Sequence, residues 1–268
     1  MIPGSRTKFR NMKTALLLSG WPRFHAEFDE QLSNLHGSEI DWIVVLWKNF
    51  PSDVDLTLNA ALTPSWMDTV KNEDDARAWL KARMPANHNL AHFSYIDWND
   101  LPDYVRRDYP NQVPGTVPEA IFRQFWMFKQ TYAVAESIGS YDLILRSRAD
   151  TSVSTPIHLD QIHKELLSDP LRLVIPSNNR QGLSWNDLFC IGLPETMKVY
   201  ATAVDHFNEV YDMGVTMHPE NIVSHVLRLR GLHWNDDGII ASIRQLGKYL
   251  TPTFVKGQKY YEADFGRW

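Results

Sequence analysis

Apolar runs of strand length alternate with amphipathic segments in the first third of the chain. Residues 14–19 and 41–47 are apolar runs, and residues 25–35, which lie between them, carry apolar side chains at helical spacing. A strand, a helix and a second strand in this order predict a β-α-β unit and therefore a parallel sheet. A helix over residues 74–84 and a third strand over residues 90–96 continue the pattern.

A long aromatic helix is predicted to begin near Pro118 and to end at Gly139. Thr116 and Glu119 have the spacing of a capping box, and proline is common in a first helical turn. The apolar face of this helix consists of Ile121, Phe122, Phe125, Trp126, Phe128, Tyr132 and Ala135. We therefore expect the helix to be buried along most of its length.

The rest of the chain carries shorter elements of both kinds. Apolar runs predict strands over residues 143–145, 171–175, 188–191 and 239–243, and helical spacing predicts helices over residues 158–167, 195–211 and 222–229. No internal repeat, low-complexity tract or linker interrupts them. The pattern predicts a single α/β domain over residues 14–268, with a mostly parallel central sheet flanked by helices, behind a flexible tail over residues 1–13.

Composition and charge narrow the classes of function. The formal charge of -5 argues against a general nucleic-acid binder, which would present a basic surface. Cys190 is the only cysteine, so internal disulfides and a cysteine-ligated zinc site are excluded. The apolar run near the start is much shorter than a signal-peptide core, and no segment reaches the ~20 apolar residues that cross a bilayer. We therefore expect a cytoplasmic protein without a transmembrane segment.

Charged side chains follow the strand predicted over residues 143–145. If the strand continues, its two-residue period places Arg146, Arg148 and Asp150 on one side, at the carboxyl end of a core strand. Ligands bind at that end of the strands in open α/β sheets. A salt-bridged strand end explains the same three residues, and both interpretations remain open at this point.

A tight loop with Ser19, Gly20 and Arg23 follows the first predicted strand. Its one glycine excludes a dinucleotide fingerprint, which needs three. Backbone amides beside Gly20 and the guanidinium of Arg23 are suited to binding a phosphate. The alternative is an ordinary strand-to-helix turn with a surface arginine.

Further polar positions lie at a loop, a helix start and a helix face. Trp185, Asn186 and Asp187 precede the strand over residues 188–191, and Asp187 either caps its loop or takes part in chemistry. Glu220 either stabilises the start of the last helix through its charge or acts as a second carboxylate. Gln124 interrupts the aromatic helix, where it lies at a solvated edge or points into a site. The chain lacks a nucleophile elbow, a phosphate-binding loop ending in lysine and a zinc-protease helix motif, which disfavours hydrolases and NTPases.

Several of these segments together resemble GT-A-type glycosyltransferases. The segments are SGWPRF, RQFWMFKQTYAVAES, YDLILRSRAD, WNDLFCIG and HPEN, and the resemblance covers about residues 14–244. It implies a single GT-A-like domain with a Rossmann-like half, across which a nucleotide-sugar donor binds. It also implies transfer of the sugar to a saccharide or another hydroxyl acceptor.

The resemblance also implies how the diphosphate of the donor is held. In this family an Asp-x-Asp motif at a strand end holds the divalent cation that bridges the diphosphate. Arg148, Ala149 and Asp150 occupy that position, so the second carboxylate of the motif is retained. Mg²⁺ or Mn²⁺ would be held through Asp150, or Arg148 would neutralise the diphosphate directly.

The resemblance and the residue pattern together assign candidate roles. The donor-binding candidates are Ser19, Gly20, Arg23, Gln124, Arg146, Arg148 and Asp150. Asp187 and Glu220 are the catalytic candidates, and Trp185 and Asn186 are the candidates for binding the acceptor. The alternative functions are a non-catalytic nucleotide-sugar or carbohydrate-binding protein on the same scaffold, and a nucleotidyltransferase.

Overall fold

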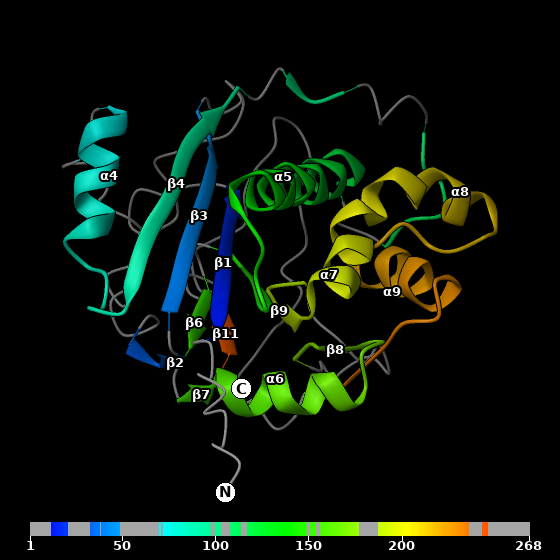
Figure 1. Ribbon diagram of the computed structural model, residues 1–268. Helices are drawn as coiled ribbons and strands as arrows, with labels where there is room; N and C mark the ends of the chain where they lie inside the picture. Colours follow the sequence, from blue (N-terminus) through cyan, green and yellow to red (C-terminus); the bar gives the residue numbers. More distant parts are fainter. Residues whose placement is uncertain are drawn as a thin grey trace, which may run out of the picture.

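The computed structural model describes residues 12–20, 33–37, 39–48, 70, 72–97, 100–102, 108–113, 117–148, 151–153, 156–176, 187–235 and 243–245. Within these ranges the chain forms a seven-stranded central sheet with helices packed against it (Figure 1). The predicted α/β class and the mostly parallel sheet are therefore confirmed. Most of the helix predicted over residues 25–35 lies outside the described residues, as do residues 1–11 and 246–268.

The central sheet has the strand order β10-β8-β9-β5-β1-β3-β4. Its strands are β1 (Lys13–Gly20), β3 (Glu39–Trp47), β4 (His88–Ile96), β5 (Leu143–Ser147), β8 (Arg172–Val174), β9 (Phe189–Gly192) and β10 (His233–Asn235). The strands β1, β3, β4 and β5 pair in parallel, whereas β9 runs antiparallel to both β5 and β8. Because β9 is reversed, its first residue lies beside the last residue of β5, in the pair Ser147 and Phe189.

The chain places successive strands on opposite sides of β1. Strands β3 and β4 extend the sheet on one side of β1, and the chain then returns to add β5 on the other side. In open α/β sheets, ligands bind outside the carboxyl ends of the strands at such a reversal of strand order. Gly20, at the end of β1, and Arg148, directly after β5, lie at this reversal of strand order.

Side chains alternate along β1 and divide the core into two layers. Ala15 and Leu17 face one layer, which includes the buried side of α5, whereas Leu16 and Leu18 face the other layer. The helices are α4 (Glu73–Lys81), α5 (Pro118–Ile138), α6 (Leu159–Ser168), α7 (Pro194–Ala201), α8 (Phe207–Asp212) and α9 (Pro219–Leu229). Helices α4 and α6 pack on the second layer, and α5, α7, α8 and α9 pack on the first. Every apolar position predicted for the buried face of α5 is buried.

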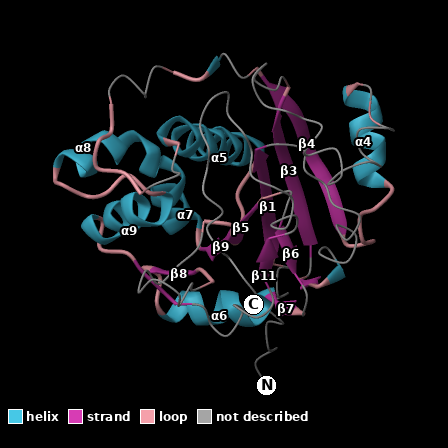
Figure 2. Ribbon diagram, turned by 180° about the vertical axis from the view of Figure 1, so that it is seen from behind, coloured by secondary structure: helices cyan, strands magenta, loops and turns pink. Residues whose placement is uncertain are grey.

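Two pairs of short strands lie outside the central sheet. Strand β2 (Leu35–His36) pairs in parallel with β7 (Ile157–His158), and β6 (Thr151–Val153) pairs antiparallel with β11 (Ile243–Gln245). Val153 packs in the same layer as α4 and α6, the side of the sheet that faces the viewer in Figure 2. The sequence does not predict β2, β6 or β7, because two or three residues carry no measurable periodicity.

The start of α5 differs from the prediction. The helix begins after Val117, whose side chain makes no capping hydrogen bond. Glu119, predicted to close a capping box with Thr116, instead accepts a hydrogen bond from Nε of Arg123 at 2.9 Å. Thr116 lies outside the described residues, and the N-cap is Val117, one residue later than the capping box predicts. The end of α5 at Gly139 is confirmed.

The single helix predicted over residues 195–211 is also wrong, because the chain changes its helical geometry midway. Helix α7 ends at Ala201, a 3₁₀ segment covers Thr202–His206, and α8 begins at Phe207. The hydroxyl of Thr202 donates to the carbonyl of Lys198 at 2.9 Å, and such bonds to the preceding turn bend helices. The apolar spacing is continuous because both helices and the 3₁₀ segment bury the same side.

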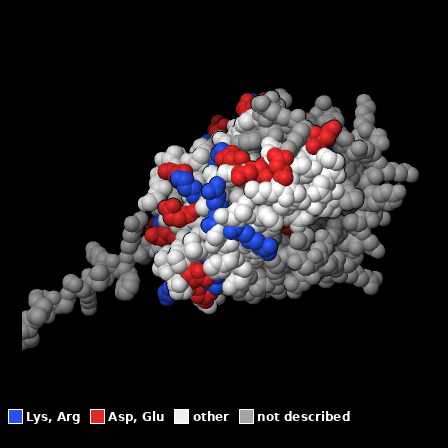
Figure 3. Space-filling model, turned by 90° about the vertical axis from the view of Figure 1, so that its right-hand side faces the viewer, with Lys and Arg blue, Asp and Glu red and all other residues white. Residues whose placement is uncertain are grey.

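The described surface mixes charges of both signs. Figure 3 shows acidic and basic side chains interspersed on the side of the molecule that carries α8 and α9. Some of these charges are paired, as in Lys198 with Glu136 at 2.8 Å and Lys129 with Asp205 at 2.7 Å. None of the helices in the described part of the chain is long and apolar enough to cross a membrane.

Candidate active site at the end of β5

The end of β1 contributes two of the predicted site residues. Ser19 is buried, and Gly20 has a φ of 113°. A Cβ on Gly20 would meet no atom within 4 Å. Glycine is therefore required for its backbone conformation, which other residues rarely adopt, rather than for lack of space. Arg23, the third residue predicted in this loop, lies outside the described residues.

At the end of β5, the candidate site is centred on the carboxylate of Asp187, which lies just before β9. Its Oδ2 accepts a hydrogen bond from Nε2 of Gln124, on α5. Nη1 of Arg148 lies 3.7 Å from the same oxygen, and the side chains of Arg148 and Asp187 are 21% and 12% exposed. Gln124 lies 63 positions before Asp187 in the sequence, and Arg148 lies 39 positions before it. Both reach the same carboxylate, because the antiparallel β9 begins where β5 ends.

The buried Arg146 supports this group through a hydrogen bond to the backbone of Asp187. It lies within β5 and is 1% exposed. Its Nη1 lies 2.5 Å from the backbone carbonyl oxygen of Asp187 and 2.5 Å from the hydroxyl of Tyr200, and it donates to both. Sequence analysis predicted direct contact between Arg146 and a donor. The observed contacts instead connect Arg146 to the backbone of Asp187, so a direct contact would require the residues above it to move.

Aromatic rings surround the guanidinium of Arg146. Its Cζ lies 4.9 Å from the ring centroid of Phe125, 5.0 Å from that of Phe128 and 5.3 Å from that of Tyr200. Its Nε and Nη2 are buried without a hydrogen-bond partner. Cation–π contacts with the ring faces offset part of the cost of burying this charge.

Tyr200 and Cys190, the tyrosine and the cysteine beside Arg146, stay neutral at physiological pH. Burial raises the pKa of the Tyr200 phenol and that of the Cys190 thiol far above their usual values, against the opposing effect of the nearby Arg146. Cys190 is fully buried, and its Sγ lies 3.5 Å from Sδ of Met197. A buried thiol of raised pKa is a poor nucleophile, so Cys190 is a core residue.

Strand β6 ties the end of β5 to the start of β9. The backbone NH of Thr151 donates to the carbonyl of Arg148 at 3.2 Å. Its hydroxyl donates to the carbonyl of Leu188 at 3.5 Å, and Thr151 is fully buried. These contacts hold the backbone at Arg148 and at Leu188, next to Asp187, and so help to position the two charged side chains.

Glu220 lies in the first turn of α9, in a different environment. Its Oε2 is 2.5 Å from Nδ1 of His218, the residue before the helix, without hydrogen-bond geometry. No contact between Glu220 and Asp187 is found among the described residues. The structure therefore brings together Gln124, Arg146, Arg148 and Asp187 and leaves Glu220 with His218.

Four predicted site residues lie outside the described residues, and others in the cluster were not predicted. Arg23, Asp150, Trp185 and Asn186 are not described, so their roles stay predictions. Sequence analysis missed Tyr200 and Thr151 as site residues. The signal for Tyr200 was available, because an arginine within a buried strand needs acceptors or ring faces from the elements that pack on it.

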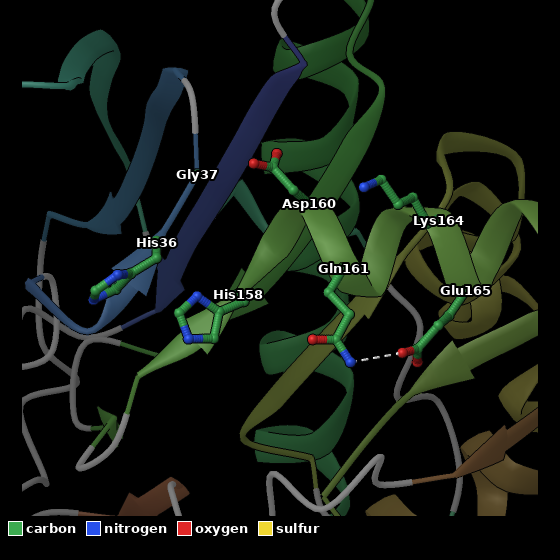
Figure 4. Close-up of a pocket in the computed structure, with 7 residues that line it drawn as sticks. All are labelled: His36, Gly37, His158, Asp160, Gln161, Lys164 and Glu165. Carbon is green, nitrogen blue, oxygen red and sulfur yellow. Dashed lines mark hydrogen bonds between the residues drawn. The ribbon is translucent and has the colours of Figure 1, made fainter.

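A separate open cavity lies at the opposite edge of the sheet, where β3 begins. It has a volume of about 580 Å³ and is lined by His36, Gly37, His158, Asp160, Gln161, Lys164 and Glu165 (Figure 4). The rings of His36 and His158 lie edge to face with centroids 5.2 Å apart. Among the described residues, no group of three or more His, Cys, Asp or Glu side chains is arranged to hold a metal ion. This cavity contains none of the predicted site residues.

The geometry at Asp187 combines a carboxylate, an amide donor and a partly exposed guanidinium at the reversal of strand order between β1 and β5. Such a group can bind an anion and can accept a proton. In comparison with known proteins, no protein-family model and no curated protein matches this chain.

Proposed function

We propose that the chain is a glycosyltransferase that moves a sugar from a nucleotide-sugar donor to a saccharide or another hydroxyl acceptor. The observation that carries this proposal is the convergence of Arg148, Gln124 and Asp187 at the reversal of strand order between β1 and β5. A cation for the diphosphate and a carboxylate for the acceptor hydroxyl are the groups that sugar transfer requires at one site.

The donor is proposed to bind across the crevice between β1 and β5. The strand order β4-β3-β1-β5 supports this position, because it is the Rossmann-like order in which nucleotides bind at the carboxyl ends of the central strands. The nucleoside would lie near Ser19 and Gly20, and the diphosphate would lie at Arg148. A guanidinium binds phosphate oxygens in a bidentate manner, and Arg148 is exposed enough to do so.

Mg²⁺ or Mn²⁺ would bind through Asp150, as the resemblance to GT-A enzymes implies. The described residues fit direct neutralisation of the diphosphate better, because Arg148 brings a positive charge to the end of β5. A bound cation would polarise the diphosphate oxygens. We therefore assign the stabilisation of the leaving diphosphate to Arg148.

Asp187 is proposed to act as the general base. Its carboxylate accepts the proton of the acceptor hydroxyl, whose oxygen forms a bond to the anomeric carbon of the sugar. The bond between that carbon and the diphosphate oxygen breaks, and the nucleoside diphosphate leaves with its electron pair. Arg148 stabilises the charge that develops on the leaving group, and Gln124 fixes the orientation of Asp187.

The proposal is tested by calorimetry with UDP-, GDP-, CMP- and dTDP-sugars, with and without Mn²⁺, followed by detection of free nucleotide. We expect one donor to bind and to be turned over. Arg148→Gln should weaken that binding by about tenfold or more, the loss of roughly one charge-assisted contact. Arg230→Gln, which alters an exposed arginine directly after α9 that contacts His206, is the matched control and should leave it unchanged.

The other outcomes separate the competing functions. Tight binding of a donor without turnover would indicate a non-catalytic binding protein. Preference for an intact nucleoside triphosphate would indicate a nucleotidyltransferase. Absence of binding to every nucleotide would contradict the proposed function.

A further inference from the structure

Oδ2 of Asp187 contacts two side chains of different charge. Gln124 is neutral and makes a hydrogen bond to this oxygen, whereas Nη1 of Arg148 lies 3.7 Å away. N–H···O hydrogen bonds are usually about 2.7–3.2 Å long. The contact between Arg148 and Asp187 is longer, so it is an ion pair without a good hydrogen bond. This contact is thus electrostatic rather than a short hydrogen bond.

Asp187 keeps its place without Arg148. Its carboxylate is bonded to Gln124, and its backbone carbonyl accepts from the buried Arg146. The next residue, Leu188, accepts from the hydroxyl of Thr151 through its carbonyl. Removing Arg148 from the carboxylate therefore leaves the backbone and one oxygen of Asp187 anchored.

Arg148 is more exposed than Asp187 and lies at the crevice between β1 and β5. An anion with several phosphate oxygens can offer this guanidinium two short hydrogen bonds in place of one long ion pair. The same anion cannot replace Gln124 at Asp187, because the ionised carboxylate needs a donor and phosphate oxygens are acceptors. Of the two contacts at Oδ2 of Asp187, the ion pair with Arg148 is therefore the one that a bound anion can replace.

We propose that Asp187 is an internal competitor for Arg148, and that it sets the affinity of the site for diphosphate groups. In the free protein, Arg148 is shared with Asp187. When a diphosphate binds, Arg148 moves to the phosphate oxygens and leaves the carboxylate open to the hydroxyl of an acceptor. This inference rests on the proposed function, and it links donor binding to the availability of the base.

Pyrophosphate is the probe that tests this competition, because it carries the diphosphate without base or sugar. Binding is measured by calorimetry at constant ionic strength for the wild type, Asp187→Asn, Arg148→Gln and the double variant. We expect Asp187→Asn to bind pyrophosphate about fivefold tighter or more and Arg148→Gln to bind it more weakly. A coupling of this size is typical of side chains in contact, roughly 1 kcal/mol.

The double variant distinguishes competition from simple repulsion. If Asp187 acts by holding Arg148, then Asp187→Asn changes affinity by less than about twofold once Arg148 is Gln. An equal gain in both backgrounds shows that Asp187 only repels the anion, and this result overturns the inference. No gain from Asp187→Asn in the wild-type background, or no pyrophosphate binding by any of the four proteins, overturns it as well.

Two controls keep the test decisive. Asp205→Asn removes a carboxylate from the Lys129 ion pair on the surface and should leave pyrophosphate binding unchanged. Arg148→Met, which also removes the charge and keeps a long side chain, replaces Arg148→Gln if the latter does not fold. Sugar transfer is assayed separately, so coupling without transfer contradicts the proposed function alone, and transfer without coupling contradicts this inference alone.

Discussion

Asp187→Asn is expected to lower the rate of sugar transfer by at least about 100-fold, the usual contribution of a general base. The amide has the shape of the carboxylate and can still accept from Gln124, but it does not take up the proton of the acceptor. The loss should appear in kcat, while KM for the donor stays the same or falls. Steady-state kinetics with the donor found by the binding panel measures both.

Asp205→Asn is the matched control, because Asp205 pairs with Lys129 on the same helix, α5, as Gln124. It should keep the wild-type rate. A folded Asp187→Asn protein with unchanged kcat would remove Asp187 from the mechanism. A change confined to KM would make Asp187 a binding residue instead.

Arg146→Ala is expected to lower the free energy of unfolding by about 3 kcal/mol or more, which is the cost typical of emptying a large buried position. The substitution leaves a space between Phe125, Phe128 and Tyr200. It also removes the donor from the carbonyl of Asp187. The wild-type protein pays a free-energy cost for burying a guanidinium without a carboxylate partner, and the loss of this cost in the variant offsets part of the destabilisation. Urea unfolding followed by circular dichroism measures the change.

Arg146→Met separates packing from hydrogen bonding. Methionine fills most of the space and makes no hydrogen bond, so it should lose about half as much stability as alanine. Arg230→Ala alters an exposed arginine and should change the free energy of unfolding by less than about 0.5 kcal/mol. An Arg146→Ala protein as stable as the wild type would show that the cluster under Asp187 does not hold the fold together.

Much of the fold is predictable because the buried strands and helices carry strong periodicity. The apolar runs of β1, β3 and β4 and the aromatic face of α5 lie where the sequence predicts them. The direction of β9 is not predictable, because four apolar residues have the same pattern in both directions. The 3₁₀ segment after α7 follows from the Thr202 hydroxyl, which apolar spacing does not reveal.

The location of the candidate site could be predicted from the sequence, whereas most of its side-chain contacts could not. The sequence predicts a site at Arg148, because ligands bind at the carboxyl ends of strands in open α/β sheets. Asp187 precedes its strand, and it lies beside Arg148 because β9 runs antiparallel to β5. Period-two alternation put Arg146 and Arg148 on the same side of β5 and could not show that one of them is buried under rings. Gln124 reaches Asp187 across 63 residues, and no local pattern predicts such a contact.

Glu220 and Asp187 are equivalent candidates in the amino-acid sequence, since each follows a loop and precedes a regular element. Their surroundings in the structure differ. Asp187 meets Arg148 and Gln124, whereas Glu220 lies beside His218 at the start of α9. The difference comes from tertiary packing, because first-turn carboxylates are common at helix starts whether or not they take part in chemistry.

The position of a bound nucleoside diphosphate tests the central claim most directly. A crystal structure determined with the nucleoside diphosphate of the preferred donor and Mn²⁺ should show the diphosphate within about 3 Å of the Arg148 guanidinium, a hydrogen-bond distance. The nucleoside should lie beside Ser19 and Gly20, in the crevice between β1 and β5. A diphosphate bound instead in the cavity between His36 and His158, or bound without contact to Arg148, would contradict the account.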